Sequence, residues 1–134
     1  MGKYKVLVVD DERDIADVIK KGLESDGAFE VEAFNSPEEA LSHFKPGKYD
    51  LLLLDIRMPK INGFQLYREL HKLDQKAKIC FITAFEIYYD EFKKMFPKIR
   101  VNCFVRKPVS IEELRKIIRE ELELQEELEL KKGN

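Results

Sequence analysis

Residues able to take part in phosphoryl chemistry stand at the ends of short apolar runs in this chain. They are Asp10, Asp11, Asp55, Thr83 and Lys107. Carboxylates that lie close together repel one another, so they need protons or a divalent cation, and Mg²⁺ binds carboxylates, water and phosphate oxygens. A lysine and a threonine at the same place would add a positive charge and a hydroxyl donor. The set predicts transfer of a phosphoryl group to the carboxylate of Asp55.

The elements that must bring these residues together are five apolar runs that alternate with helical patterns. The runs cover residues 4–9, 29–34, 50–54, 79–83 and 101–105. Four of them are continuously apolar, as in strands of a parallel sheet buried on both faces, whereas the run at 29–34 alternates and suits an edge strand. We therefore predict an α/β fold of the flavodoxin-like, doubly wound kind, with five parallel strands in the order 2-1-3-4-5, each followed by a helix. In such a fold the carboxyl ends of the strands share one rim, where ligands bind.

Helices between the strands are indicated by apolar spacing and by capping residues. The apolar stripes comprise Ile15, Val18, Ile19 and Leu23 in the first helix, and Leu66, Leu70 and Leu73 in the third. Ser36 and Ser110 each stand three residues before a glutamate, a capping box that predicts the start of the second and fifth helices. Residues 90–95 predict a fourth helix, which ends near Pro97.

Four sequence fragments together resemble the receiver domain of two-component response regulators. They are Val9-Asp10-Asp11, Leu54-Asp55-Ile56-Arg57-Met58-Pro59 with Gly63, Thr83-Ala84, and Lys107-Pro108. Each fragment alone is common, but all four in this order, each at the end of a predicted strand, are typical of that family. The resemblance covers residues 4 to about 122, and we expect a receiver domain at 1–122 followed by an acidic extension of the last helix at 123–134.

The resemblance implies a phosphoacceptor and a metal site among the acidic residues. Asp55 would accept the phosphoryl group, in a reaction that depends on Mg²⁺, for which Mn²⁺ could substitute. Asp11 would be the direct carboxylate ligand of the metal, with Asp10 assisting, partly through water, and Asp55 would belong to the same metal site. The backbone carbonyl of Arg57 would complete the protein's share of the ligands.

The remaining matches imply a switch. Thr83 would be the hydroxyl that moves toward the phosphoryl group, Lys107 its ion-pair partner, and Phe104 an aromatic side chain that changes rotamer. The Lys107–Pro108 peptide bond would be cis. The implied partners are a histidine kinase or phosphotransfer protein, which supplies the phosphoryl group, and a downstream protein target. The domain would catalyse only its own phosphorylation and dephosphorylation.

Each of these residues also has a purely structural interpretation. Asp11 would cap the first helix, Lys107 would be an ordinary surface lysine, Thr83 an ordinary strand-end residue and Phe104 a core aromatic. Two other functions use a similar set. A haloacid-type phosphatase carries a second aspartate two residues after its nucleophile, where this chain has Arg57. A degenerate receiver would only bind a partner.

Composition limits the classes of protein that fit. The chain has 134 residues, a length for one domain, and its 24 basic and 26 acidic residues are so nearly balanced that we expect no direct contact with nucleic acid. No apolar run is long enough to span a membrane and no signal peptide is evident, so we expect a cytoplasmic protein. Cys80 and Cys103 stand in separate apolar runs without a CxxC partner, which predicts reduced core thiols.

Two further features leave alternatives open. The last helical pattern runs from Ser110 to about Lys132, roughly 33 Å at 1.5 Å per residue, and its end is either a solvated tail or an extension that dimerises or binds a partner. The fourth helical region is rich in aromatic residues, which either pair with the core or form a partner patch; they are Phe85, Tyr88, Tyr89 and Phe92. His43 and His71 have no second ligand nearby in sequence and are predicted to be surface residues.

Overall fold

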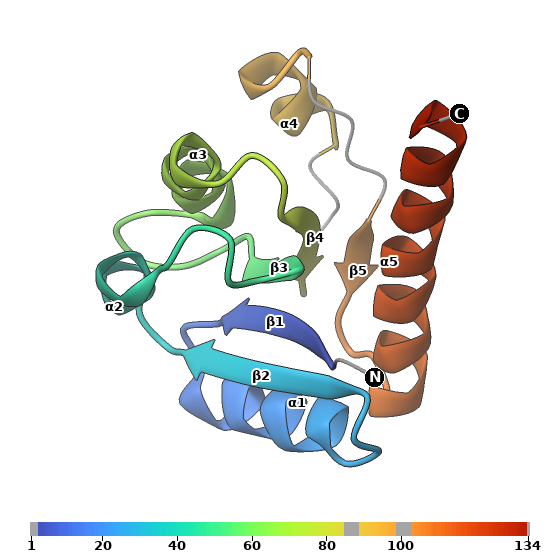
Figure 1. Cartoon of the computed structure of the whole chain (residues 1–134). Coiled ribbons are helices and arrows are strands. Elements are labelled where there is room, and N and C mark those ends of the chain that lie inside the picture. The colour runs from blue at the N-terminus through green and yellow to red at the C-terminus, as the bar shows by residue number, and fades with distance from the viewer. Residues whose placement is uncertain (1–2, 85–88, 99–102, 134) are drawn as a thin grey trace.

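The fold is a five-stranded parallel sheet with helices on both faces, in a computed structural model that describes residues 3–84, 89–98 and 103–133 (Figure 1). Strands and helices alternate along the chain: β1 (Tyr4–Val9), α1 (Arg13–Glu24), β2 (Phe29–Phe34), α2 (Pro37–His43), β3 (Leu51–Asp55), α3 (Gly63–Leu73), β4 (Lys78–Thr83), α4 (Tyr89–Met95), β5 (Phe104–Arg106) and α5 (Ile111–Gly133). The strand order β2-β1-β3-β4-β5 confirms the predicted topology, with β2 at an edge.

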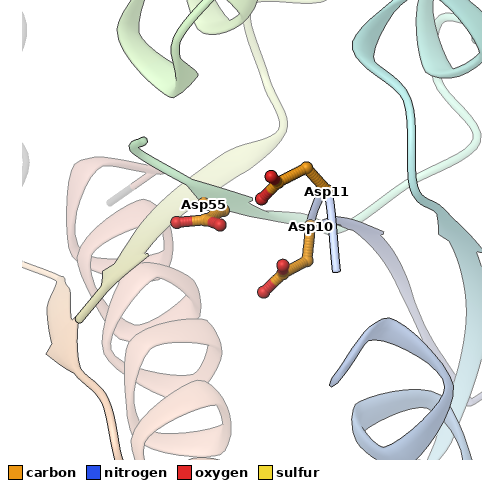
Figure 2. Close-up of side chains that lie close together, drawn as sticks. All are labelled: Asp10, Asp11 and Asp55. Carbon is orange, nitrogen blue, oxygen red and sulfur yellow. The ribbon is translucent and has the colours of Figure 1, made fainter. Parts of the chain in front are cut away.

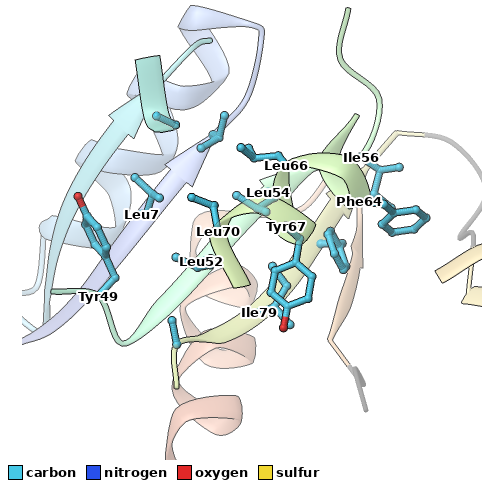
Figure 3. Packing of buried hydrophobic residues seen from close by; sticks show 14 of the residues in the cluster. Leu7, Tyr49, Leu52, Leu54, Ile56, Phe64, Leu66, Tyr67, Leu70 and Ile79 are labelled. Atoms are coloured by element: carbon cyan, nitrogen blue, oxygen red, sulfur yellow. The ribbon is translucent and has the colours of Figure 1, made fainter. Parts of the chain in front are cut away.

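Two apolar clusters, one on each face of the sheet, form the core. On one face, buried residues of α2, α3 and α4 pack against alternate strand residues such as Leu7, Leu52 and Leu54 (Figure 3). On the other face, α1 and α5 cover the intervening residues, including Val8 and Leu53. Because successive side chains of a strand point to opposite faces, both sets must be apolar, which explains the continuous apolar runs in the sequence.

Several boundaries and burial predictions need correction. β3 begins one residue later than predicted and includes Asp55, β4 begins one residue earlier, and β5 is described only from Phe104 because residues 99–102 lie outside the described ranges. Val18 and Leu73, expected on buried stripes, are 58% and 50% exposed. The side chain of Val18 does not face the sheet. It lines an apolar hollow between α1 and the start of α5. Leu73 is the last residue of α3, beyond the part of the helix that packs on the sheet.

Capping residues set the starts of three helices. Ser36 and Ser110 accept hydrogen bonds from the backbone N–H groups of Glu39 and Glu113, at 3.4 and 3.1 Å, which confirms the serine half of each predicted capping box. A third cap was missed. Asn62 accepts from the N–H of Gln65 while the Gln65 side chain accepts from the N–H of Asn62, both at 2.8 Å. This reciprocal pair fixes the first turn of α3, the helix that follows the loop after Asp55.

An ion pair on α1 covers the outer edge of β2. The N–H groups of Tyr4 and Asp10 donate to the carbonyls of Ala28, directly before β2, and of Phe34, its last residue, so the even-numbered residues face β1. Val31 is odd-numbered, and its backbone groups therefore point away from β1. The ammonium of Lys20 donates to the Val31 carbonyl at 2.7 Å, and the carboxylate of Glu24 accepts from the Val31 N–H at 3.0 Å. Lys20 and Glu24 also bind each other at 3.0 Å. The pair therefore satisfies backbone groups that an edge strand normally leaves open.

The prediction that both cysteines are reduced is wrong for this structure. Cys80 in β4 and Cys103, directly before β5, form a disulfide. Adjacent strands bring their Cα atoms to 4.6 Å, within the range that a disulfide spans, although the two residues are 23 positions apart in sequence. Neither cysteine stands in a local motif that marks it as half of a disulfide, so only the pairing of the fourth and fifth strands brings the two together.

Some sequence predictions fall outside what the structure describes. Phe85 and Tyr88 lie in the range 85–88, outside the described residues. The structure also does not describe the side chains of Tyr89 and of residues 124–134. The alternatives for the aromatic patch and for the end of α5 therefore stay open. His43 is exposed as predicted, whereas His71 is half-buried, with its ring nitrogen 3.3 Å from the Tyr67 hydroxyl. Within the described ranges, no helix is both long enough and apolar enough to span a membrane.

Candidate functional site

The carboxyl ends of four strands bring the predicted site residues to one rim of the sheet. Asp10 directly follows β1, Asp55 and Thr83 are the last residues of β3 and β4, and Lys107 directly follows β5. Backbone hydrogen bonds hold these ends together past the regular pairing. The N–H of Ile56 donates to the Ile82 carbonyl at 3.0 Å, and that of Lys107 donates to the Thr83 carbonyl at 2.8 Å. The rim is therefore part of the sheet and not a set of separate loops.

Three carboxylates form the centre of the site (Figure 2). Asp10, Asp11 and Asp55 each offer an oxygen within 4.8 Å of the others. Asp10 is fully buried, Asp55 is 4% exposed and Asp11 is half-buried, so the group opens to solvent mainly past Asp11. Asp11 does not cap α1, because the N-cap residue is Glu12, and it is Asp10 that accepts a hydrogen bond from the Glu12 N–H at 3.0 Å.

Lys107 supplies the positive charge of the site. Its ammonium lies 2.7 Å from a carboxylate oxygen of Asp10 and 3.5 Å from one of Asp55, and its side chain is only 12% exposed. Burial alone would lower the pKa of Lys107, but the hydrogen bond to Asp10 and the charges of Asp55 and Asp10 raise it, so the ammonium stays charged. The interpretation of Lys107 as an ordinary surface lysine is therefore wrong.

The charges of this site do not balance without a further cation. Burial, and next the charge of Asp10, raise the pKa of Asp55 to about 7, although the charge of Lys107 acts in the opposite direction. Three carboxylates facing one ammonium carry an excess of negative charge, and all three offer hard oxygen ligands. These are the donors and the charge that Mg²⁺ requires, so the residues fit a magnesium ion.

The loop between Asp55 and α3 is held unusually close to the site. The N–H of Gly63 donates to the carbonyl of Ile56 at 2.8 Å. A Cβ on residue 63 would lie 2.4 Å from the carbonyl oxygen of Asp55, closer than real Cβ atoms approach, so only glycine fits there. Lys60 in the same loop has a positive φ of 70°. The sequence reasoning noted Gly63 as part of a motif but gave it no role.

Thr83 and Phe104 occupy the places expected of them, but the structure does not test their movement. Thr83 is fully buried at the end of β4. Phe104 is half-buried and its ring stacks on Phe81 at 5.6 Å between centroids and meets Phe92 edge-on at 6.2 Å. It thus packs against the core in this state. The Lys107–Pro108 peptide bond is cis, as the resemblance implied.

Comparison with known proteins identifies the class of protein that this fold and site define. The family model of the response regulator receiver domain matches residues 6–119. YkoG of Bacillus subtilis (strain 168), an uncharacterized transcriptional regulatory protein, is 34% identical over 114 residues. The chain therefore belongs to the receiver domains of two-component response regulators. That match covers 85% of this chain and 49% of YkoG, so the chain spans about half the length of the curated relatives it matches.

Solved structures agree with this assignment. The receiver domain protein of Methanospirillum hungatei JF-1, described as CheY-like, superposes with a TM-score of 0.81 at 29% identity, covering 94% of this chain and 98% of that one. TrrA of Thermotoga maritima, solved in complex with Mg²⁺ and BeF, gives a TM-score of 0.73 at 33% identity, covering 87% of this chain and 97% of that one. TrrA has also been solved in complex with the histidine kinase ThkA (TM-score 0.71, 34% identity, the same coverage).

Proposed function

We propose that this domain is a phosphorylation-controlled switch in which Asp55 accepts the phosphoryl group. The observation that supports this most directly is the meeting of three carboxylate oxygens within 4.8 Å, with the ammonium of Lys107 3.5 Å from Asp55. Phosphoryl transfer depends mainly on positioning and on neutralising the charge of the transferred group. An acidic metal site beside a fixed ammonium meets both needs, and the family assignment supports the same function.

We assign the metal to Asp10, Asp11, Asp55 and the backbone carbonyl of Arg57. When bound, Mg²⁺ would neutralise charge on the phosphoryl oxygens and on the carboxylates. The magnesium complex of TrrA, at 33% identity, supports this choice. Mn²⁺, which has similar oxygen ligands, is expected to substitute.

In the proposed reaction a carboxylate oxygen of Asp55 attacks the phosphorus of a phosphohistidine, and the bond from phosphorus to the imidazole nitrogen breaks. The imidazole takes the electron pair of that bond and then a proton. Lys107, now 2.7 Å from Asp10, would pair with an oxygen of the new acyl phosphate. The hydroxyl of Thr83 would move to donate to the same group, and hydrolysis of the acyl phosphate would reset the domain.

The proposed output is a changed partner-binding face. As Thr83 moves, α4 and β5 shift, and Phe104 turns inward from its half-buried place beside Phe81 and Phe92. A coupling of roughly 1–3 kcal/mol would change partner affinity about 5- to 150-fold. A downstream protein is the proposed target, with no direct contact to nucleic acid or membrane. The proposed domain boundary stays at residue 122, with 123–134 as an extension of α5 available to a partner or a second copy.

The proposed donor is a histidine kinase or phosphotransfer protein in the cytoplasm, since TrrA forms a complex with such a kinase. An apolar hollow between α1 and the start of α5 adjoins Lys107 and includes the exposed Val18 and also Pro108. A partner that must reach Asp55 can bury this hollow at the same time. Val18→Asp should therefore slow transfer from a kinase while leaving phosphorylation by acetyl phosphate unchanged, whereas equal slowing of both would contradict the docking role.

Intact-mass spectrometry after treatment with acetyl phosphate and Mg²⁺ tests the proposed phosphoacceptor. Wild type should gain one phosphoryl group, and Asp55→Asn should gain none. Asp50→Asn is the matched control, because Asp50 directly precedes the other end of the same strand, where its carboxylate accepts from the Lys5 N–H at 2.8 Å. An adduct on Asp55→Asn would overturn the assignment, and no adduct on wild type would favour a degenerate receiver. Steady turnover of p-nitrophenyl phosphate would contradict a domain that acts only on itself.

A further inference from the structure

The disulfide joins the two strands whose ends hold Thr83 and Lys107. Cys80 is the third residue of β4, and Thr83 follows it by three residues on the same strand. Cys103 directly precedes β5, and Lys107 follows that strand. Both cysteines lie on the face that α1 and α5 cover. A covalent bond between the strands therefore stands at one end of the pair, and two of the site residues stand at the other.

Among the described residues, β5 lies at the edge of the sheet and pairs with β4 alone. Its described part, Phe104–Arg106, is in register with Phe81, Ile82 and Thr83 of β4. Backbone bonds lie at both ends: Phe81 N–H to Cys103 carbonyl at 2.9 Å, and Lys107 N–H to Thr83 carbonyl at 2.8 Å. Edge strands, which pair on one side only, open locally more easily than central strands. The disulfide therefore adds a covalent restraint to a strand that is paired on one side only.

The position of Lys107 depends on that pairing. Its backbone is anchored to Thr83, and its ammonium reaches across the rim to Asp10 at 2.7 Å and to Asp55 at 3.5 Å. If β5 opens, the anchor at Thr83 is lost and the ammonium no longer has a fixed place beside the carboxylates. Because phosphoryl transfer relies on fixed charges, the state of the strand pair should change its rate.

We propose that Cys80 and Cys103 form a reversible redox site whose oxidation holds Lys107 and Thr83 in place for phosphorylation. This inference rests on the proposed function of Asp55. It adds a second input, because in the cytoplasmic location proposed above a disulfide is expected to be redox-sensing and not permanent. Reduction loosens β5 and slows phosphorylation, and oxidation restores it.

The co-reactant of this site is a low-molecular-weight disulfide such as oxidised glutathione. A thiolate of the reduced pair attacks one glutathione sulfur and releases one glutathione, leaving a mixed disulfide. The second cysteine then attacks the protein sulfur of that bond and releases the second glutathione. Two electrons pass from the protein to the reagent, and the two thiol protons end on the two glutathione molecules. Cys80 is fully buried and Cys103 is 4% exposed, so exchange requires local opening and should begin at Cys103.

The first experiment counts thiols. Wild type is equilibrated in glutathione buffers of increasing oxidised fraction, unfolded in an alkylating reagent, and weighed intact. We expect two alkylated thiols in the reducing buffers and none in the oxidising ones, with the change reversed by returning the protein to reduced glutathione. Two thiols in every buffer, or none in any, would overturn the redox site. Cys103→Ala, which leaves one cysteine, should give one alkylated thiol in the reducing buffers.

The second experiment measures coupling to the proposed phosphorylation site. Oxidised wild type should gain a phosphoryl group from acetyl phosphate and Mg²⁺ roughly 3- to 10-fold faster than reduced wild type, given the sensitivity of such reactions to positioning. The matched control, Cys80→Ala with Cys103→Ala, should behave as the reduced protein in both buffers. Equal rates in the two forms of wild type would overturn the coupling.

Hydrogen exchange keeps the two proposals separable. Reduced wild type should exchange the backbone amides of residues 104–107 at least about tenfold faster than oxidised wild type, while β1 amides keep their protection. If no form of the protein accepts a phosphoryl group, the proposed function fails and the thiol and exchange results still decide whether the bond is reversible and restrains β5. Unchanged exchange at 104–107 would overturn the inference even if Asp55 is phosphorylated.

Discussion

The close approach of α3 to the end of β3 makes Gly63→Ala a direct test of how the site is held. The new Cβ would lie 2.4 Å from the carbonyl oxygen of Asp55 and 3.0 Å from the Cα of Ile56. Both are backbone atoms, and ordinary contacts begin at 3.4 Å, so α3 or the end of β3 must move by about 1 Å. Overpacking of this kind should lower the free energy of unfolding by about 1–3 kcal/mol. A 1 Å displacement of the nucleophile should slow phosphorylation by up to about 100-fold.

Two measurements on the same samples test this reasoning. Urea unfolding gives the change in stability, and the growth of the phosphoryl adduct on the intact mass gives the rate. Gly47→Ala is the matched control, because a Cβ there meets no atom within 4 Å but the residue has a φ of 81°. It should cost about 1–2 kcal/mol through backbone strain, at the opposite end of β3, and leave the rate unchanged. A wild-type rate for Gly63→Ala, or equal slowing in Gly47→Ala, would refute the argument.

Three further predictions concern stability. Lys60→Gly should raise the free energy of unfolding by about 0.5–1 kcal/mol in urea, because glycine removes the strain of a φ of 70° at a smaller entropic cost. The disulfide joins residues 23 positions apart, so its reduction should lower the free energy of unfolding by about 3 kcal/mol. Urea unfolding with and without reductant measures this change. The hydrogen bond from the Val31 N–H outweighs the effect of burial and holds the pKa of Glu24 below its usual 4.5. The carboxylate therefore stabilises the fold above pH 4.5, and this contribution is lost as the pH falls through the lowered pKa. The urea midpoints of wild type and Glu24→Gln should accordingly converge in acid.

Sequence reasoning found the topology and the site because both leave local traces. Continuous apolar runs require burial on two faces, and chemically active residues directly after such runs must meet at one rim of a parallel sheet. Asp10, Asp55 and Lys107 each stand at or directly after the end of such a run, so the sequence predicts that they lie together. The prediction about Val18 failed because a periodic stripe does not reveal how much of a helix surface its neighbours cover.

Other features depend on contacts between distant segments. The disulfide requires Cys80 and Cys103 to lie opposite each other in the register of two adjacent strands. The number of residues between two cysteines does not determine that register. Glycine is required at position 63 because the first residue of α3 lies directly against the backbone of Asp55 and Ile56. A pattern in a single sequence does not reveal such a contact between a helix and a strand end. The cap at Asn62 was different. The pattern of asparagine followed by glutamine three residues later was present in the sequence and was overlooked.

The ion pair of Lys20 and Glu24 on β2 bears on how the protein avoids aggregation. An uncovered parallel edge can recruit an extended segment of another chain, a first step toward domain swapping or fibrils. Here an incoming strand would have to displace two side chains from the N–H and carbonyl of Val31 before making its own hydrogen bonds. At this position of the β2 edge, recruitment of another backbone would therefore cost the protein both hydrogen bonds to Val31.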